Sequence, residues 1–479
     1  MTLLSPATLA QVPYGIARPA YGDVPVGIVH FGPGAFHRAH QAAYVDALLA
    51  HDPRWGIAAV SLRTRGTVDA LAAQDGLYTL AIRDAEPCMR VIGAHRRFLG
   101  PEDAAQTLAL LADPAVGLVT TTVTEKGYCL AADGTLDMAH PDIVHDQSGV
   151  AIPRSVVGWI VAGLSERRRL GLAPFVPMPC DNLASNGAKL HAALVAFAAA
   201  DNRDLAAWIA GEVRVPSTMV DSITPASDDA LLADVVDALG LRDRAPVQRE
   251  AFTQWVIEEV GSIGPDLASV GATVTSDVAG YERAKLRILN GAHSTLAYAG
   301  LLRGHASVAE AMADADLARF IDAMIREDIA AVLTPVASLD LDAYRVAVLA
   351  RFRNPAIVHR LDQIAIDGSQ KLPYRLGDTL LANRQAGRMP KRVAAAFGCW
   401  VAFLMARARS GVAISDPLGT RLAELAADGD AAAVVERLVA TGLGLPAGVA
   451  GDEALLAKVC AAAGAAASDD WTRVFGSGH

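Results

Sequence analysis

Short apolar runs rich in β-branched residues recur along the first half of the chain, and segments with apolar residues at helical spacing lie between them. The runs that we interpret as strands cover residues 26–31, 56–62, 116–124 and 174–178. Helical patterns follow the first run, as far as residue 49, and the last run, over residues 189–199. Strands that alternate with helices are typical of a parallel sheet, so this half is predicted to be an α/β domain.

The pattern changes near residue 276. Beyond this point the sequence is rich in Ala and Leu and has few β-branched runs, which indicates helices. We therefore expect an α/β domain over residues 1–276 and a mostly α-helical domain over residues 277–479. A polar stretch at residues 366–373 interrupts the helical pattern and is predicted to be a loop, and residues 476–479 are expected to form a frayed tail.

Composition and charge narrow the class of protein. The chain has 479 residues, of which 52% are hydrophobic and 20% charged, and this is enough apolar sequence for two globular domains. Its formal net charge is -10 and its basic residues are scattered, so nothing marks a nucleic-acid-binding surface. The five cysteines include no Cys-x-x-Cys pair, which argues against both a disulfide framework and a structural zinc site.

Targeting signals are not evident. The N-terminus lacks a basic region followed by an apolar run, and no stretch approaches the roughly 18 apolar residues that cross a membrane. Reduced thiols fit the cytosol. We expect a cytoplasmic protein that binds neither membrane nor nucleic acid, acts on a small molecule, and exists as a monomer or a small homo-oligomer.

A glycine turn follows the first predicted strand. Gly32 and Gly34 stand between that strand and the helical pattern, at the position of the phosphate-binding turn in dinucleotide-binding domains. Gly32 permits the turn, and Gly34 lets a pyrophosphate approach the backbone at the start of the helix. The third glycine of the usual fingerprint is absent because His37 stands there, so the turn alone is weak evidence. The residues predicted to bind the cofactor at this turn are Gly32, Gly34, Ala35 and Phe36.

The end of the second strand bears on the choice of cofactor. An acidic residue at this point usually accepts a hydrogen bond from the ribose 2′-hydroxyl of NAD, and this chain has Ser61, Arg63, Thr64 and Arg65 instead. Arg63 is a candidate for binding the cofactor, and either arginine would suit the 2′-phosphate of NADP, although arginines are also common at exposed strand ends. We expect NAD, with NADP as the open alternative.

Polar residues follow the other two predicted strands. Glu125 and Lys126 come directly after the third strand, and Asn182 comes shortly after the fourth. The carboxyl ends of parallel strands share the edge of the sheet where ligands bind, so these side chains are expected to meet in one crevice. Asn182 also suits a helix cap. Asp221 is the single acid of a later β-like run and is expected either to meet a partner or to lie on the surface.

Residues 281–293 combine an amine, an amide, an imidazole and a carboxylate. In an α-helix, Glu282, Lys285, Asn290 and His293 would lie within an arc of about 140°. Apolar residues are interleaved with them, so Lys285 is expected to be partly buried, and burial lowers the pKa of a lysine toward that of a general base. The alternative is a surface lysine on a half-buried helix. A Tyr-x-x-x-Lys match at the same lysine is typical of short-chain dehydrogenases, but the glycine turn has the wrong spacing for that class.

Six motifs occur in one order along the chain. They are Gly32-x-Gly34-x-Phe36-His37-Arg38-Ala-His40-Gln41, Thr124-Glu125-x-Gly127-Tyr128, Cys180-Asp181-Asn182-x3-Asn186-Gly187, Met219-Val-Asp221-x-Ile-Thr-Pro225, Lys285-x4-Asn290-x2-His293 and Asp367-Gly368-Ser369. Together they resemble the mannitol dehydrogenase family of polyol-specific long-chain dehydrogenases over nearly the whole chain. The resemblance implies an N-terminal Rossmann-type dinucleotide-binding domain, a helical C-terminal domain, an active site between them and a mechanism without metal.

The same resemblance implies roles for individual residues. Lys285 would be the general acid and base, and Asn182 and Asn290 would hold the reacting oxygen. His293 would position the substrate, and Glu125 would serve as a proton-relay or active-site carboxylate.

Two departures from mannitol-oxidising relatives bear on the substrate. Lys126 stands where those relatives have glycine, and Gln363 stands where they have arginine. Both features look like the fructuronate reductases, or mannonate oxidoreductases, of the same family. A sugar acid carries a carboxylate, and Lys126 near Lys371 would offset the cost of burying it, unless Lys126 points to solvent. Asp221 is assigned to the substrate site as well, while Ser222 replaces an arginine that is usual in relatives.

We therefore predict an NAD(P)-dependent oxidoreductase that interconverts D-fructuronate and D-mannonate. Three other substrate pairs stay open on the same scaffold, namely mannitol and fructose, arabinitol and xylulose, and altronate and tagaturonate. A non-catalytic dinucleotide-binding sensor is the alternative of a different class. Lys285, Asn290 and His293 argue against it, because a sensor needs no base.

Overall fold

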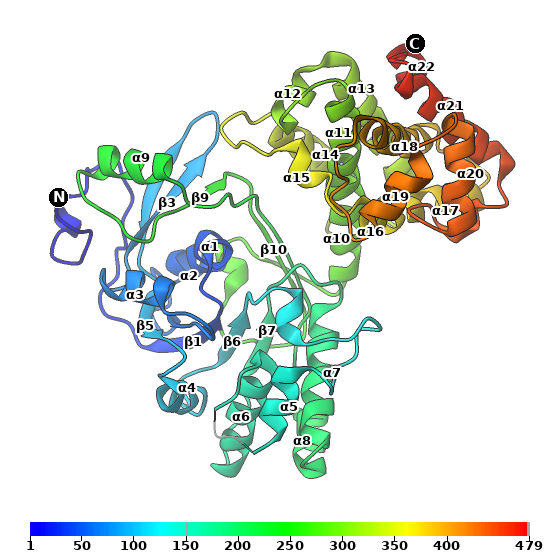
Figure 1. The fold of residues 1–479 in the computed structure, drawn as a ribbon. Coiled ribbons are helices and arrows are strands. Elements are labelled where there is room, and N and C mark those ends of the chain that lie inside the picture. The colour runs from blue at the N-terminus through cyan, green and yellow to red at the C-terminus, as the bar shows by residue number, and fades with distance from the viewer. Residues whose placement is uncertain (150–151, 477–479) are drawn as a thin grey trace. The chain divides into compact units, whose positions relative to one another are not determined.

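The computed structural model describes residues 1–149 and 152–476, and Figure 1 shows its elements. The chain divides into two compact units, residues 1–279 and 280–479, and each is described by itself. Residues 477–479 of the expected frayed tail lie outside the described part of the chain.

A five-stranded parallel sheet forms the centre of the first unit. Its strands are β1 (Val26–Phe31), β2 (Gly56–Val60), β5 (His95–Leu99), β6 (Leu118–Thr121) and β7 (Val176–Pro179). They lie in the order β5-β2-β1-β6-β7, and every neighbouring pair is parallel. Four of them match the predicted runs, so the α/β class is confirmed. The strand order reverses beside β1, which makes the adjacent ends of β1 and β6 the topological switch point where such sheets bind ligands.

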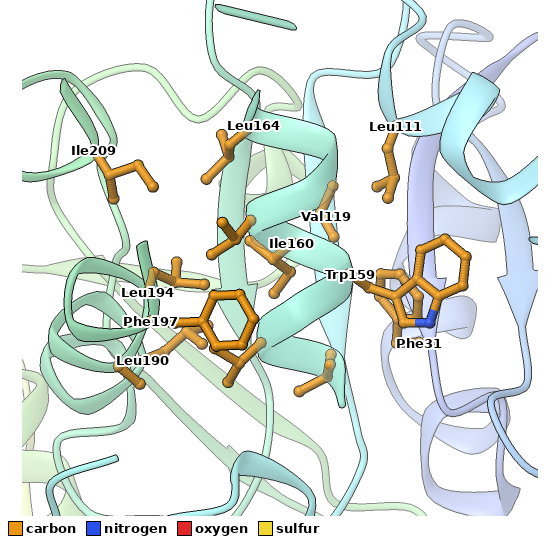
Figure 2. Close-up of a cluster of buried hydrophobic side chains, with 14 of the residues drawn as sticks. Phe31, Leu111, Val119, Trp159, Ile160, Leu164, Leu190, Leu194, Phe197 and Ile209 are labelled. Atoms are coloured by element: carbon orange, nitrogen blue, oxygen red, sulfur yellow. The ribbon is translucent and has the colours of Figure 1, made fainter. Parts of the chain in front are cut away.

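Helices pack on both faces of this sheet. Val29 and Phe31 of β1 belong to a buried apolar cluster with α6 and α7, part of which Figure 2 shows, whereas Ile28 belongs to a cluster with α2. Neighbouring residues of a strand point to opposite faces of the sheet, so the single apolar strand β1 contributes side chains to both clusters. The helices of this unit are α1 (Ala35–Ala39), α2 (Gln41–Leu48), α3 (Gly66–Ala72), α4 (Ala104–Leu111), α5 (Pro141–Gln147), α6 (Val156–Arg169), α7 (Asn186–Ala199), α8 (Arg203–Glu212) and α9 (Asp229–Leu239).

Two smaller sheets complete the first unit. One has the order β11-β10-β8, and the other has the order β4-β3-β9. Their strands are β3 (Tyr78–Arg83), β4 (Cys88–Ile92), β8 (Thr218–Asp221), β9 (Val247–Glu250), β10 (Gln254–Glu258) and β11 (Thr273–Thr275). Only β8 lies in a run that the sequence pattern marked as β-like.

The described part of the second unit is helical, as predicted. The division between the units falls within α10 (Val278–Ala284), and α18 packs against α11 and α21. The α-helices that follow α10 are α11 (Gly291–Leu302), α12 (Val308–Ala313), α13 (Ala315–Ala323), α14 (Leu341–Phe352), α15 (Leu361–Ile364), α16 (Gly368–Leu372), α17 (Asp378–Gln385), α18 (Lys391–Ser410), α19 (Gly419–Ala426), α20 (Ala431–Thr441), α21 (Glu453–Ala467) and α22 (Trp471–Phe475).

The long helix α18 corrects one expectation. By length and composition alone it could cross a membrane. The prediction that no segment is long and apolar enough for this is therefore wrong. Its apolar side chains, from Val393 to Met405, are buried within the second unit. A core helix buried on several sides is apolar all round, and this gives the same signal as a membrane span.

Three segments of the second unit are π-helical, namely η4 (Lys285–Asn290), η5 (Met324–Ile329) and η7 (Pro373–Gly377). The predicted helix around Lys285 therefore exists, but its centre is wider than an α-helix. The arc calculated for α-helical geometry does not apply there. Such π-helical turns are rare and are frequently found at functional sites.

The loop predicted at residues 366–373 is limited to residues 366 and 367, which form a turn, and the prediction is wrong from Gly368 onward. Asp367 has a φ of +58°, and helix α16 begins directly after it and continues through Pro373 into η7. Proline has no backbone N–H to bond to the preceding turn, and its ring crowds that turn, so an α-helix cannot continue regularly through it. The π-helical spacing at Pro373 keeps the chain helical at this point.

Candidate functional site

The glycine turn lies at the end of β1, at the switch point of the sheet. Gly32 has a φ of +90°, and a Cβ there would lie 2.3 Å from the carbonyl oxygen of Thr122, so only glycine fits. A Cβ at Gly34 would have no neighbour closer than 3.9 Å. The space above Gly34 fits the close approach of a pyrophosphate, and Ala35 and Phe36 open α1 directly beside it.

A histidine cluster explains the missing third glycine. The ring of His37 stacks on that of His30 with 3.3 Å between centroids, and its Nε2 lies 3.0 Å from Nε2 of His95. All three rings are buried, and burial lowers the pKa of His37 and His95 well below 6.5 and that of His30 to about 3. The flat imidazole stack thus packs α1 against the strand where other dinucleotide domains use glycine. Neither His30 nor His95 was predicted to belong to the site, although His30 is a polar residue inside the apolar run of β1.

Both arginines after β2 are already paired with carboxylates. Arg63 forms an ion pair with Asp142 at 3.0 Å. Arg65 contacts three acids, which are Asp69, Glu102 and Asp103. The positive charge at this strand end is therefore balanced before any ligand binds.

The loops after β6 and β7 are joined by Asp181. Its carboxylate accepts hydrogen bonds from the backbone N–H of Thr124 at 2.8 Å and from the hydroxyl of Tyr128 at 2.6 Å. Burial raises the pKa of Asp181, although these hydrogen bonds act in the opposite direction. Thr124 has a φ of +67°, a strained conformation for a β-branched residue. Asp181 therefore holds this strained loop, a role that was not predicted from the sequence.

The polar residues predicted for this edge lie on those two loops. Glu125 and Lys126 are exposed directly after the strained Thr124, and Asn182 is exposed in the loop after β7. Asn182 is not the cap of α7, because that helix begins at Asn186.

Asp221 and Asn186 lie inside the first unit. Asp221 ends β8 and is 5% exposed, so its placement on the surface is excluded. The side chain of Asn186 donates to the carbonyl oxygens of Pro179 and Thr218 and accepts from the N–H of Thr218. Asn186 thus fixes the end of β7 beside β8, a structural role that the motif alone did not reveal.

In the second unit, Lys285 opens the π-helical segment η4 and Asn290 closes it. Both side chains are half-buried, and His293 follows in the first turn of α11. The His293 ring packs on Phe352 with 4.4 Å between centroids, and burial lowers its pKa well below 6.5. Among the described residues, Nε2 of His293 has no hydrogen-bond partner. A buried neutral imidazole with an unused nitrogen suits a role in holding a ligand.

The segment η7 packs against η4 in the same unit. Gly291 permits this approach, because a Cβ there would lie 2.9 Å from the side chain of Leu376. One turn earlier, Nζ of Lys371 donates to the carbonyl oxygen of Ile366 at 2.8 Å. Burial lowers the pKa of Lys371, and the neighbouring Arg375 lowers it further. The unit therefore gathers an amine, an amide, an imidazole and two further cations around two π-helical turns.

One cluster has the donor types of a metal site. Cys129, His140 and Asp142 offer atoms within 4.8 Å of one another. The His140 side chain, however, accepts the N–H of Asp142, and Asp142 pairs with Arg63. Burial, with the carboxylates of Asp142 and Asp146, raises the pKa of Cys129 to about 11, which disfavours the thiolate that binds metals. Since these donors are already in use, we assign no metal to them.

Comparison with known proteins covers both units. The family model described as Mannitol dehydrogenase Rossmann domain matches residues 26–268, and the one described as Mannitol dehydrogenase C-terminal domain matches residues 277–458. The chain is 40% identical to D-mannonate oxidoreductase of Escherichia coli K12 over 416 residues, which cover 84% of this chain and 86% of that protein. It is 39% identical to D-arabinitol 4-dehydrogenase of Ralstonia nicotianae over 404 residues, which cover 82% and 86%.

A solved structure extends the likeness to nearly the whole chain. The ternary complex of Pseudomonas fluorescens mannitol 2-dehydrogenase with NAD and D-mannitol has a TM-score of 0.82 and 35% identity. The match covers 99% of each chain. The Rossmann-type domain and the helical domain expected from the sequence are thereby confirmed.

Proposed function

The chain belongs to the mannitol dehydrogenase family, and from this premise we propose that it interconverts D-fructuronate and D-mannonate by hydride transfer with NAD(H). Members of the family are oxidoreductases that act on CH–OH groups of polyols or sugar acids. The Escherichia coli relative is named for mannonate, which supports a sugar acid as substrate here.

The observation that carries the choice of an acid is the positive charge beside Asp367. Lys371 is half-buried, Arg375 lies close enough to lower its pKa, and both belong to the unit that contains Lys285. Asp367 pairs with Lys371 at 3.8 Å and balances one of these two charges, so one half-buried positive charge remains that an anionic ligand would compensate and a neutral polyol would not. We propose that Lys371 and, from the first unit, Lys126 lie near the carboxylate of the substrate.

The proposed mechanism uses Lys285 as the acid and base. In oxidation Lys285 removes the proton of the reacting hydroxyl, while Asn182 and Asn290 donate hydrogen bonds to the developing alkoxide. The nicotinamide cofactor supplies the acceptor of the hydride in this direction and its donor in reduction. In reduction Lys285 begins as an ammonium and gives its proton to the carbonyl oxygen.

The other predicted residues have supporting roles in this proposal. His293 positions the substrate, and its buried Nε2 is the atom available for that purpose. Glu125 relays the proton to solvent, which suits its exposed position. Asp221 contacts the sugar hydroxyl groups.

The proposed cofactor is NAD, bound at Gly32, Gly34, Ala35 and Phe36, because the end of β2 is balanced in charge. A 2′-phosphate at this strand end would meet the carboxylates that already pair with Arg63 and Arg65. Introducing a dianion beside four carboxylates costs more than binding the neutral ribose hydroxyl of NAD. Arg63, which is largely exposed, is proposed to lie beside the adenosine.

A substrate panel tests the proposal. Reduction of D-fructuronate, D-tagaturonate and D-fructose is followed with NADH and then with NADPH. We expect D-fructuronate with NADH to give the highest kcat/KM. A preference for fructose would overturn the choice of a sugar acid. NADH binding without turnover of any sugar acid or polyol would favour the alternative that the protein is a non-catalytic dinucleotide-binding sensor.

A second substrate class has its own support. The D-arabinitol 4-dehydrogenase of Ralstonia nicotianae is nearly as similar to this chain as the mannonate enzyme. D-xylulose therefore belongs in the same panel, as the ketose partner of arabinitol.

A further inference from the structure

Arg375 makes fewer described hydrogen bonds than the buried arginines Arg38, Arg167 and Arg249. Arg38 and Arg249 each donate to two backbone carbonyl oxygens, and Arg167 donates to four. Arg375 makes one described hydrogen bond, from Nη1 to the hydroxyl of Ser294 at 3.0 Å. A guanidinium has five N–H donors, so most of the hydrogen-bonding capacity of Arg375 is unused.

The charge of Arg375 is also uncompensated within its unit. Among the described residues of the second unit, no carboxylate lies within ion-pair distance of its guanidinium. The nearby Asp367 pairs with Lys371 at 3.8 Å, and Asp416 accepts the N–H and hydroxyl of Ser369. Burial lowers the pKa of Arg375, which reflects the cost of holding its charge away from water. An unpaired cation in such surroundings is stabilised when an anion binds to it.

The position of Arg375 connects it to the proposed chemistry. It lies in η7, which packs against the segment η4 that carries Lys285 and Asn290. Its hydrogen-bond partner Ser294 is the residue directly after His293. An anion held by Arg375 would therefore lie beside the residues to which we assign the proton transfer and the positioning of substrate.

We propose that Arg375 binds the carboxylate of a sugar-acid substrate and thereby selects acids over neutral polyols. The proposal rests on the sugar-acid function above and adds the group that recognises the acid. Guanidinium and carboxylate are both planar and form two parallel hydrogen bonds, which an ammonium cannot reproduce. Ser294 fixes the orientation of the guanidinium through Nη1, and Lys371 adds positive charge from the preceding turn. Arg375 is thus a specificity residue that touches substrate away from the reacting carbon.

The test compares substrates that differ only at the acidic group. Fructuronate and fructose form such a pair for reduction, and mannonate and mannitol form one for oxidation. In Arg375→Gln we expect kcat/KM for both acids to fall about a hundredfold, mainly through KM, because the buried charge pair is lost. We expect kcat/KM for fructose and mannitol to change less than about threefold. Arg375→Lys keeps the charge without the planar fork and should recover only part of the loss.

Arg421→Gln is the matched control. Arg421 lies on the exposed side of α19, where it pairs with Glu424, and its loss should leave all four substrates unaffected. A wild-type preference for fructose would defeat the proposed function itself. A wild-type preference for fructuronate, with Arg375→Gln reducing acids and polyols equally, would overturn only the role of Arg375.

A measurement on the wild-type protein avoids any dependence on the folding of a variant. Hydrogen exchange of residues 373–377 is followed with D-mannonate and with D-mannitol at saturating concentrations. We expect D-mannonate to slow exchange in this segment and D-mannitol to leave it unchanged. Equal protection by both ligands would contradict the proposal even if Arg375→Gln did not fold.

Discussion

The two units hold their functional groups in different ways. In the first unit the backbone sets the positions, through strand ends, a glycine with a φ of +90° and loops joined by Asp181. In the second unit side chains on π-helical turns and in the first turn of α11 set them, and two nitrogens among these, Nε of Arg375 and Nε2 of His293, have no described hydrogen-bond partner. A fixed backbone cradle suits a ligand that many enzymes share, whereas individual side chains suit the substrate, which differs between relatives. We therefore expect changes in the first unit to affect stability and cofactor binding, and changes in the second to affect turnover and choice of substrate.

Lys285→Ala should have the largest effect on turnover. It tests whether the second unit contributes to catalysis without contributing to NADH binding. A positioned acid or base contributes about 10² to 10⁴ in rate, so kcat should fall to about one per cent or less. NADH binding should persist, because the glycine turn is unchanged. Turnover and NADH titration by fluorescence measure the two quantities, with Lys458→Ala on the exposed side of α21 as the control. Turnover above a few per cent of wild type at neutral pH would remove Lys285 from the mechanism.

Two glycine substitutions should separate folding from cofactor binding in the first unit. Gly32→Ala brings a Cβ to 2.3 Å from the Thr122 carbonyl oxygen at a positive φ, and we expect it to lower the free energy of unfolding by about 3 kcal/mol. Gly34→Ala adds its Cβ where no atom lies closer than 3.9 Å, so stability should change by less than about 1 kcal/mol.

The Gly34 variant should nevertheless bind NADH more weakly, because its methyl group occupies the space left for the pyrophosphate. Urea unfolding and NADH titration of both variants distinguish the effects. Unchanged NADH affinity in Gly34→Ala would show that the open side of the turn is not a ligand cradle.

The same contrast explains what the sequence could predict. The strands and the turn of the first unit have local signals, because β-branched residues are enriched in strands and Gly32 accepts the positive φ that the turn requires. The π-helical turns arise from packing, such as the approach of η7 to Gly291, and the helical continuation through Pro373 had no local signal. The residues predicted for the site came from motifs, whereas His95 and Asp181 became visible only when distant segments met. Arg375 was equally hidden, since an unpaired guanidinium can be recognised only among its neighbours.

The histidine cluster should make the first unit sensitive to acid. The folded-state pKa of His30, about 3, and those of His37 and His95 lie below the unfolded value of 6.5. Below pH 6.5 the unfolded chain therefore binds protons that the folded chain does not. Stability is fully present above that pH and falls as pH decreases, by up to about 1.4 kcal/mol per pH unit for each histidine.

Hydrogen exchange of β1 and α1 between pH 7.5 and 5.0, corrected for intrinsic rates, measures this dependence. His95→Gln removes one titrating ring. It should therefore reduce the dependence of stability on pH by the contribution of one histidine, up to about 1.4 kcal/mol per pH unit. An unchanged slope would mean that His95 is already protonated in the folded protein.

Lys126→Ala should have the smallest effect and decide which unit recognises the acid. Lys126 is exposed, and an exposed cation contributes less than about 1 kcal/mol to an ion pair, so kcat/KM for D-fructuronate should fall no more than about fivefold. Fructose reduction, measured alongside, should not change. A loss above about tenfold that is confined to the acid would mean that Lys126 becomes desolvated when substrate binds. Recognition of the carboxylate would then depend on a flexible side chain of the first unit. The expectation that the first unit binds the cofactor and the second unit selects the substrate would no longer hold.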